Sequence, residues 1–490
     1  MFDRIPHRHP SWSNGSNGLG RVANSIRSAS IQRPALNSCA SIIRNGRVCS
    51  SRRHQSTATT IPRSKEYKET LLKIESAIAK IDAENAHHHK PEGAEESRSI
   101  KAGQRIHVLG QTSLGLFAAY SIASLTKPPP LTYLLHQPHR FQKWYDEGTA
   151  IEFMKQGKSE YRLGIDVEFS YMKYEADAKK TNFTDFDHNF GYLKNRDEWI
   201  IEKLLVATVP SATIAALLPV KARLGAYSTI CLLDHGPGMV DKINRLIFPN
   251  PATRPRYILG MSTHGLHPIP RRFGFTQTTV GQISLSTVPV AEVEPVASSG
   301  DLIKRMDYGY NECSTNFIRT LARSADMGVK TMPYGVFLIA QWERHLVDSI
   351  MHPLSAIFGC NYSRLQSTSS TRRLIHNLLE ESIPIILALP EMQRASRERS
   401  TAQNAAKVFT VKRMEAIIYN RLRSLGENTS PMVRNMERGT KTEIDELNGY
   451  IVRRGEDLGI PTPVNSTVME MVRTKQVMHK ETAESEIPLE

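Results

Sequence analysis

The feature that most constrains this chain is a buried strand followed by a glycine-containing turn and an apolar helix. Residues 106–110 read Ile-His-Val-Leu-Gly, the turn continues Gln-Thr-Ser-Leu-Gly, and residues 116–125 form an apolar run. This order opens a βαβ unit that binds a dinucleotide, with its pyrophosphate at the helix N-terminus. The residues expected to hold the cofactor in this turn are Gly110, Gln111, Thr112, Ser113, Leu114 and Gly115.

The glycine fingerprint of that turn is incomplete. The pattern G-x-G-x-x-G appears as Gly110, Thr112 and Gly115. A branched side chain therefore stands where the backbone normally approaches the pyrophosphate. We expect Thr112 to weaken phosphate binding without abolishing it.

The second strand, residues 131–135, indicates which dinucleotide the chain prefers. At the end of this strand an NADP enzyme needs a cation for the 2′-phosphate, and an NAD enzyme needs an acid. The chain has His136, Arg140 and Lys143 there, and no acid. We predict weak binding that favours NADP, with His136 and Arg140 as cofactor-binding residues.

A second informative stretch, residues 341–360, predicts a buried helix with one polar stripe. Arg344, Asp348 and His352 recur every four residues, so they lie on one helix face beside apolar neighbours such as Trp342 and Leu346. This face could line a cleft. The alternative is a solvated stripe with one ion pair between residues four apart.

The rest of the chain is consistent with an α/β domain followed by a helical domain. Strands are expected at 204–209, at 229–233 before the turn 234–238, and as an antiparallel pair within 258–286. Residues 146–200 predict a hairpin and a polar surface insertion, 312–326 a helix, and 328–333 an exit strand. Further helices are expected at 372–387, 402–425 and 440–458. The expected domains are therefore 104–334 and 335–475, with a disordered tail at 476–490.

The N-terminal segment has a composition of its own. The net charge of the chain is +14, and residues 1–64 alone hold ten Arg, no Lys and one acid, Asp3. An Arg-rich, Ser-rich and acid-poor N-terminus is typical of a mitochondrial transit peptide. The alternative is a disordered basic arm that binds nucleic acid.

Residues 65–103 are expected to connect this segment to the body of the protein. Residues 65–85 place Leu71, Ile74, Ile78 and Ile81 on one face of an amphipathic helix. Residues 86–103 are polar and are expected to form a flexible linker. Its triple histidine, residues 87–89, leaves metal binding as the alternative.

Cysteine and hydropathy patterns exclude several classes of protein. The five cysteines are scattered without a C-x-x-C pair, which argues against a zinc site or a disulfide framework. No apolar run is long enough to span a bilayer. We therefore expect no metal site and no transmembrane segment.

Three motifs together resemble the ketopantoate reductases (2-dehydropantoate 2-reductases). Trp342 and residues 353–357, Pro-Leu-Ser-Ala-Ile, match the first long helix of that family's C-terminal domain. Residues 442–449, Thr-Glu-Ile-Asp-Glu-Leu-Asn-Gly, match its closing signature, and residues 234–238 match its H-N-G-x-G turn. The chain resembles a divergent, fungal-type mitochondrial member. The resemblance implies a Rossmann-like NADP-binding α/β domain, followed by an all-α C-terminal domain like that of 6-phosphogluconate dehydrogenase.

The same resemblance implies functional positions, several of which have changed. The catalytic Lys position holds Arg344, and the two Asn positions that follow hold Asp348 and His352. The Asn that meets the nicotinamide end corresponds to His235. A Lys that the family places after the strand at 204–209 falls on Pro210.

Two further positions keep a residue that the family could use. Glu443 matches the family's Glu that contacts cofactor and substrate. The substrate Ser falls on Pro431, with Ser430 beside it. We therefore assign catalysis to Arg344 and Glu443, and substrate binding to Asp348, His352 and Ser430.

Two functions remain open at this stage. The first is an NADP-dependent reductase in the mitochondrial matrix that converts ketopantoate to pantoate for pantothenate biosynthesis. The second is a catalytically inactive mitochondrial protein that binds RNA or a protein partner, for example in gene expression. A homodimer is compatible with either.

Overall fold

The computed structural model describes residues 104–155, 157–170, 200–270, 272–289, 312–397 and 405–485. By internal contacts the chain divides into residues 1–62 and 63–490, and every described residue belongs to the second unit. The transit peptide, amphipathic helix and linker predicted for residues 1–103 lie outside the described residues. No helix among the described residues is long and apolar enough to cross a membrane.

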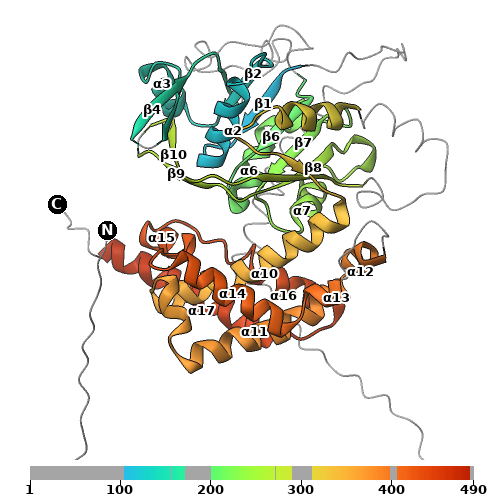
Figure 1. The fold of residues 1–490 in the computed structure, drawn as a ribbon, viewed down its shortest axis with the longest axis vertical. Coiled ribbons are helices and arrows are strands. Elements are labelled where there is room, and N and C mark those ends of the chain that lie inside the picture. The colour runs from blue at the N-terminus through green and yellow to red at the C-terminus, as the bar shows by residue number, and fades with distance from the viewer. Residues whose placement is uncertain are drawn as a thin grey trace, which may run out of the picture. The chain divides into compact units, whose positions relative to one another are not determined.

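The α/β part is built on a mainly parallel sheet (Figure 1). Its strand order is β12-β11-β8-β7-β6-β1-β2-β5. The bounds are β1 Ile106–Leu109, β2 Leu131–Leu135, β5 Asp166–Phe169, β6 Lys203–Val206, β7 Thr229–Leu233, β8 Arg256–Ser262, β11 Ile283–Thr287 and β12 Lys330–Thr331. Strand β8 pairs antiparallel with β11, as the pattern at 258–286 predicts. Strands β1, β2, β6 and β7 are buried along their whole length, which explains their continuous apolar sequence.

A second, four-stranded sheet packs on the helix α2, Ser113–Ala123. Its order is β4-β3-β10-β9, with β3 Ile151–Lys155, β4 Lys158–Arg162, β9 Gly265–Pro268 and β10 Gly274–Thr279. The predicted hairpin is the antiparallel pair of β3 and β4. Its place in a separate sheet follows from packing, because Phe153 stacks on Phe275 beside Tyr120 of α2.

The short helices of the α/β part connect the strands. They are α3 Pro138–Asp146, α6 Thr213–Leu217 and α7 Met239–Leu246, with single turns η2 Pro210–Ala212, η3 Leu218–Arg223 and η4 Pro251–Thr253. Residues 312–322 are helical, close to the range expected from the sequence.

The helical part begins with α10, Tyr334–Phe358. The other elements are η5 Tyr362–Gln366, α11 Ser369–Ala388, α12 Pro390–Arg397, α13 Ala405–Val408, α14 Val411–Leu425, α15 Pro431–Glu437, α16 Asn448–Leu458 and α17 Pro463–Ser485. As predicted, Trp342, Leu346 and Ile350 of α10 are buried, and Trp342 stacks on Tyr450 of α16.

The strand expected at 204–209 ends at Val206, and the exit strand expected at 328–333 is limited to Lys330–Thr331. Three boundaries in the helical part also differ from the sequence expectation. The helix expected at 402–425 is divided, because Thr410 caps a new helix, α14, through its hydroxyl. The helix expected at 440–458 starts at Asn448, after a series of turns. The tail expected from 476 remains helical to Ser485, and the Gln476 side chain anchors it by accepting hydrogen bonds from the Thr442 amide and hydroxyl.

Helix α10 belongs to the cores of both parts. Phe337, near its start, packs in the cluster that contains Leu204 and Leu232 of the main sheet. Trp342 and Leu346 pack in the core of the helical part. The two parts therefore share a helix, and the polar stripe of α10 comes to face the ends of the strands.

Candidate functional site

A cavity of about 620 Å³ lies between the loops that follow the strands and the helices α10 and α16. Its lining includes Arg344, Asp348 and His352 together with Glu443, so the predicted polar face of α10 lines a cleft. His235 lines the same cavity. Gly110 of the expected cofactor turn is not among its lining residues.

Arg344 is held by groups on both sides of the cavity. Its Nη1 donates hydrogen bonds to Asp234 Oδ1, at 3.0 Å, and to the Ser262 carbonyl, at 2.9 Å. Its Nε lies 3.6 Å from Asp348 Oδ2. The charge of Asp234, aided by Asp348, raises the pKa of the Arg344 guanidinium. Arg344 is therefore a permanent cation whose charge is already offset by two carboxylates.

Asp234 has an unusual backbone conformation that suits this role. It is one of two described residues other than glycine with a positive φ, 56°, a region that Asp tolerates better than most residues. Its Oδ1 also accepts a hydrogen bond from the Ser262 amide at 2.7 Å. Our sequence analysis did not select Asp234, although it directly precedes His235.

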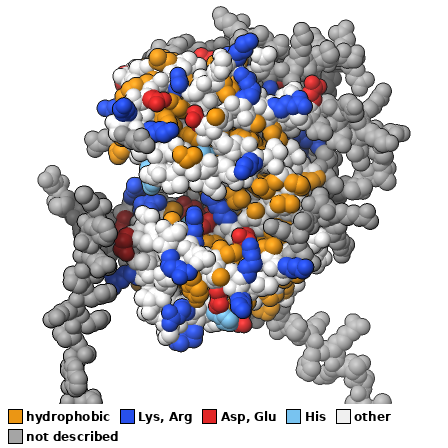
Figure 2. Space-filling view, in the orientation of Figure 1, with side chains coloured by type: hydrophobic (Ala, Val, Ile, Leu, Met, Phe, Trp, Pro, Cys, Tyr) orange, Lys and Arg blue, Asp and Glu red, His pale blue; other side chains and the backbone are white. Residues whose placement is uncertain are grey.

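The charge balance of the cavity is acidic. Its lining contains eight carboxylates against five Lys and Arg side chains. Acidic and basic side chains lie together in the hollow between the two parts (Figure 2). The acids are Asp234, Asp241, Asp348, Glu443, Asp445, Glu446, Glu456 and Asp457, and the bases are Lys242, Arg245, Arg344, Arg453 and Arg454. A keto acid, which carries a negative charge, gains no net attraction here.

Glu443 is the lining acid best suited to hold a proton. Its Oε1 accepts a hydrogen bond from Asn435 Nδ2 at 2.9 Å, whereas its Oε2 is buried without a partner. Burial raises the pKa of this carboxyl, and the nearby charge of His352 opposes that rise. His352 Nε2 lies 3.7 Å from Asp348 Oδ1.

Two histidines in the lining are buried and neutral. The ring of His235 bonds through Nε2 to Thr213 Oγ1 at 2.8 Å, and its carbonyl accepts from Gln341 Nε2 at 2.8 Å. His345 packs against Trp342 and Tyr450, with an unpartnered Nε2. Burial lowers the pKa of each histidine to about 4. No sequence pattern marks His345 as a site residue, because it falls on the apolar side of α10.

The glycine turn is closed by contacts within the chain. Gly110 has φ of 120°, and a Cβ there would lie 2.4 Å from the Ala207 carbonyl oxygen. A Cβ on Gly115 would lie 2.2 Å from the Gly110 carbonyl oxygen. Both positions require glycine for packing alone, so their presence does not depend on a nucleotide.

Thr112 occupies the helix N-terminus that a pyrophosphate would use. Its hydroxyl donates to the Ala207 carbonyl at 2.6 Å and accepts from the Gly115 amide at 3.2 Å. The side chain is therefore the N-cap of α2 and ties the turn to the end of β6. Gln111, Ser113 and Leu114 are half-buried around it. These residues do not fit a tightly bound dinucleotide.

Of the two side chains predicted to bind the 2′-phosphate, one is uncharged. His136 Nδ1 lies 2.8 Å from Ser170 Oγ, and burial lowers the pKa of His136. A neutral imidazole contributes no charge toward a phosphate. Arg140, in the first turn of α3 and half-buried, is the remaining cation of the predicted pair.

Ser430 lies outside the cavity lining. It is fully buried and caps α15 by accepting from the Val433 amide at 3.1 Å, and its hydroxyl donates to the His352 carbonyl at 3.5 Å. Its neighbour Pro431 lines the cavity instead. The geometry gives Ser430 a structural role, and its proposed contact with substrate is untested.

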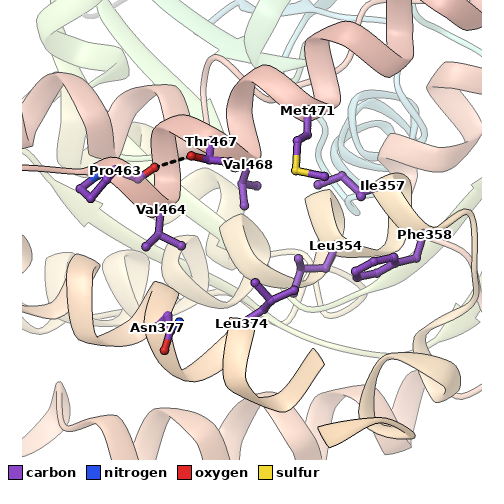
Figure 3. A pocket seen from close by; sticks show the side chains of 10 residues that line it. All are labelled: Leu354, Ile357, Phe358, Leu374, Asn377, Pro463, Val464, Thr467, Val468 and Met471. Carbon is purple, nitrogen blue, oxygen red and sulfur yellow. Dashed lines mark hydrogen bonds between the residues drawn. The ribbon is translucent and has the colours of Figure 1, made fainter. Parts of the chain in front are cut away.

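The other chemistry considered has little support in the described part of the chain. No group of three or more His, Cys, Asp or Glu there could hold a metal ion. A second pocket, of about 330 Å³, lies between α10, α11 and α17 (Figure 3). Its walls are almost entirely apolar, and the Thr467 hydroxyl donates a hydrogen bond to the Pro463 carbonyl. This pocket has no reactive group.

The fold places this chain in a class of two-part proteins. In this class an α/β part of the dinucleotide-binding type comes first, and an all-helical part follows. Residues 337–476 match the family model described as "Ketopantoate reductase PanE/ApbA C terminal". The helical part of the chain is therefore similar to the C-terminal part of the ketopantoate reductases, and the predicted fold class is confirmed.

Two relatives that cover about three quarters of this chain have names that describe different functions. A probable 2-dehydropantoate 2-reductase of Schizosaccharomyces pombe is 22% identical over 372 residues, covering 76% of this chain and 96% of the relative. The cytochrome B translational activator CBS2 of Saccharomyces cerevisiae is 20% identical over 402 residues. The match covers 77% of this chain and 97% of the activator. These similarities leave open whether the chain is an enzyme.

A solved structure confirms the architecture. The ternary structure of D-mandelate dehydrogenase with NADH and anilino(oxo)acetate has a TM-score of 0.54 at 13% identity. The matched region covers 76% of this chain and 99% of the dehydrogenase chain. At this identity the likeness shows the fold alone.

The contacts of Thr112 predict how nucleotide binding responds to substitution. Thr112→Gly removes the hydroxyl that occupies the Gly115 amide, so NADPH affinity should rise about tenfold. Titration of purified protein with NADPH, followed by nucleotide fluorescence, measures this. Thr112→Ser keeps the hydroxyl and is the control. Equal gains for both variants would show that the cap does not limit binding.

The buried histidines predict that stability falls in acid. The folded pKa of His345, about 4, is below the unfolded value of about 6.5, so the unfolded chain binds more protons between these values. The stabilisation is complete above pH 6.5 and is lost as pH falls toward 4. When the pH falls from 7.5 to 4.5, the His345→Phe variant should lose about 2 to 3 kcal/mol less unfolding free energy than the wild type loses. Urea unfolding at pH 7.5 and 4.5 tests this, and equal losses in both proteins would contradict it.

Proposed function

We propose that this chain is a catalytically inactive protein with the ketopantoate reductase fold, and that it acts as a binding factor in mitochondrial gene expression. The observation that carries the proposal is the state of Arg344, whose guanidinium is held between Asp234 and Asp348. The similarity to a translational activator over 97% of that protein's length supports a role in gene expression.

Reduction of a keto acid needs a proton donor at the developing alkoxide. A lysine suits this step because burial can tune its pKa, whereas an arginine is effectively always protonated. Arg344 has its pKa raised further by Asp234. Loss of general acid catalysis costs a factor of about 10² to 10⁴ in rate.

Arg344 is also poorly placed to bind the substrate carboxylate. An incoming carboxylate would compete with Asp234 and Asp348, and its charge would be repelled by both. Together with Thr112 in the pyrophosphate position, this arrangement disfavours each of the three requirements of the reaction: hydride donor, proton donor and carboxylate site.

An NADP-dependent 2-dehydropantoate 2-reductase is the second candidate, and Glu443 is the observation in its favour. Glu443 has a buried oxygen without a partner and a raised pKa, so it could supply a proton in place of the missing lysine. In this candidate Asp348 and His352 contact ketopantoate, and Arg140 binds the 2′-phosphate.

A restored lysine should distinguish the two candidates. We expect no ketopantoate-dependent oxidation of NADPH by the wild type. Arg344→Lys combined with Asp348→Asn and His352→Asn should raise the rate, because it supplies a tunable donor and removes a repelling charge. The control combines Arg344→Gln with the same two Asn substitutions. A wild type that is active and loses its activity on Arg344→Lys would make Arg344 an electrostatic catalyst.

The matrix location proposed for this protein rests on the composition of residues 1–64. We expect the segment to be removed on import into mitochondria, at a position within about residues 50–65. N-terminal sequencing of the mature protein measures the cleavage point. An intact Met1 on protein from a cytosolic fraction would exclude the proposed import.

A further inference from the structure

Exposed arginines surround the second half of α14 in the helical part. We call this surface the arginine face. It consists of Arg364 in η5, Arg372 at the start of α11, Arg421 and Arg423 in the last turns of α14, and Arg434 in α15. All five are exposed, and no described carboxylate lies within ion-pair distance of any of them.

The arginine face is built from four elements that contact one another around the end of α14. Burial raises the pKa of Tyr362, and both Arg434 and Arg421 lie close enough to oppose that rise. Arg364 is two residues from Tyr362 in the same turn. The amides of residues 362 and 363 bond to carbonyls of residues 428 and 426, which fixes η5 against the end of α14.

The other side of the arginine face is held in the same way. Arg372 Nη1 donates to the Gln366 carbonyl of η5 at 3.2 Å. Arg372 also opposes the rise that burial causes in the pKa of Tyr419, which lies one turn before Arg423 in α14. Both groups of arginines therefore flank the same half of α14.

These arginines retain unused donors. Arg423 Nη2 donates to Asn420 Oδ1 at 2.5 Å, and Arg434 Nη1 donates to the Thr429 carbonyl at 2.7 Å. Each bond orients the side chain and uses one of five N–H groups. The remaining donors of such a planar fork match the geometry of phosphate oxygens.

The composition of this surface favours RNA over a lipid surface. A peripheral membrane site combines basic residues with exposed apolar side chains. The large exposed apolar residues of the helical part are Phe358, Met471, Val477 and Met478. Phe358 and Met471 line the apolar pocket, and the last two lie in α17. On the drawn face of the helical part, basic side chains predominate over acidic ones (Figure 2).

We infer that the arginine face binds the phosphate backbone of single-stranded RNA. The inference rests on the proposed function and adds the class of partner and the surface that takes it. Arginines supply sequence-independent phosphate contacts. Half-buried Tyr419 beside Arg372 and Arg423 adds an aromatic group of the kind on which a base stacks.

The experiment measures binding of the full chain to a labelled single-stranded RNA of about 20 nucleotides by fluorescence anisotropy, at several salt concentrations. The test variant is Arg421→Gln, Arg423→Gln, Arg434→Gln. The control, Arg319→Gln, Lys330→Gln, Lys158→Gln, removes three exposed cations from the α/β part. The Arg-rich residues 1–64 are present in all three proteins, so their contribution cancels.

We expect the test variant to lose about tenfold or more in affinity at low salt. Loss of three phosphate contacts should also make the slope of log affinity against log salt shallower by about 2. The control should match the wild type. Replacing the same three arginines by Lys should restore much of the binding if the fold is intact, because charge is kept.

Three results would overturn the inference. The test variant and the control could bind RNA equally well, the wild type could show no RNA binding, or it could bind phosphatidylserine vesicles and not RNA. A NADPH oxidation assay with ketopantoate on the same samples separates the two proposals. Activity there would overturn the proposed function and leave the RNA result standing, whereas absence of both activity and RNA binding would overturn only the arginine face.

Discussion

The arrangement of the cavity depends on the ion pair between Arg344 and Asp234. The pair joins the polar face of α10 to the loop after β7, and the Ser262 carbonyl brings in the end of β8. Arg344 is 42% exposed and Asp234 29% exposed, so solvent limits the pair to about 1 kcal/mol of stability. Its larger consequence is chemical, because the pair occupies Arg344, which stands where the resemblance to the ketopantoate reductases implies a catalytic lysine.

The same principle applies at the glycine turn. A hydroxyl from Thr112 satisfies the N-terminus of α2, and glycine is required at 110 and 115 by contacts with backbone carbonyls. Contacts within the chain are therefore enough to explain the outline of this turn, because the glycines and the threonine each satisfy a packing or hydrogen-bonding requirement.

Charge is distributed differently inside the cavity and on the outer surface. In the cavity, the two carboxylates of Asp348 and Asp234 outnumber the single cation of Arg344, and a small anion gains little by entering. On the arginine face, cations stand without carboxylate partners, and their field extends into solvent. The molecule is therefore better suited to hold an extended polyanion on its surface than a small keto acid in its cleft.

The sequence by itself determined the architecture. Continuous apolar runs identified the buried strands, and the four-residue spacing in α10 placed Arg344, Asp348 and His352 on one face, because both patterns follow from local geometry. Glu443 was found through a motif. Only the tertiary structure decided what these groups contact. Asp234 and His345 joined the cavity, and Ser170 joined His136, through contacts between residues far apart in the chain, and no local pattern encodes such contacts. Thr112 looked like a mild obstacle in the sequence. In the structure its hydroxyl caps α2 at the Gly115 amide, and only the tertiary structure adds the Ala207 carbonyl, 95 residues away, as the group to which that hydroxyl donates.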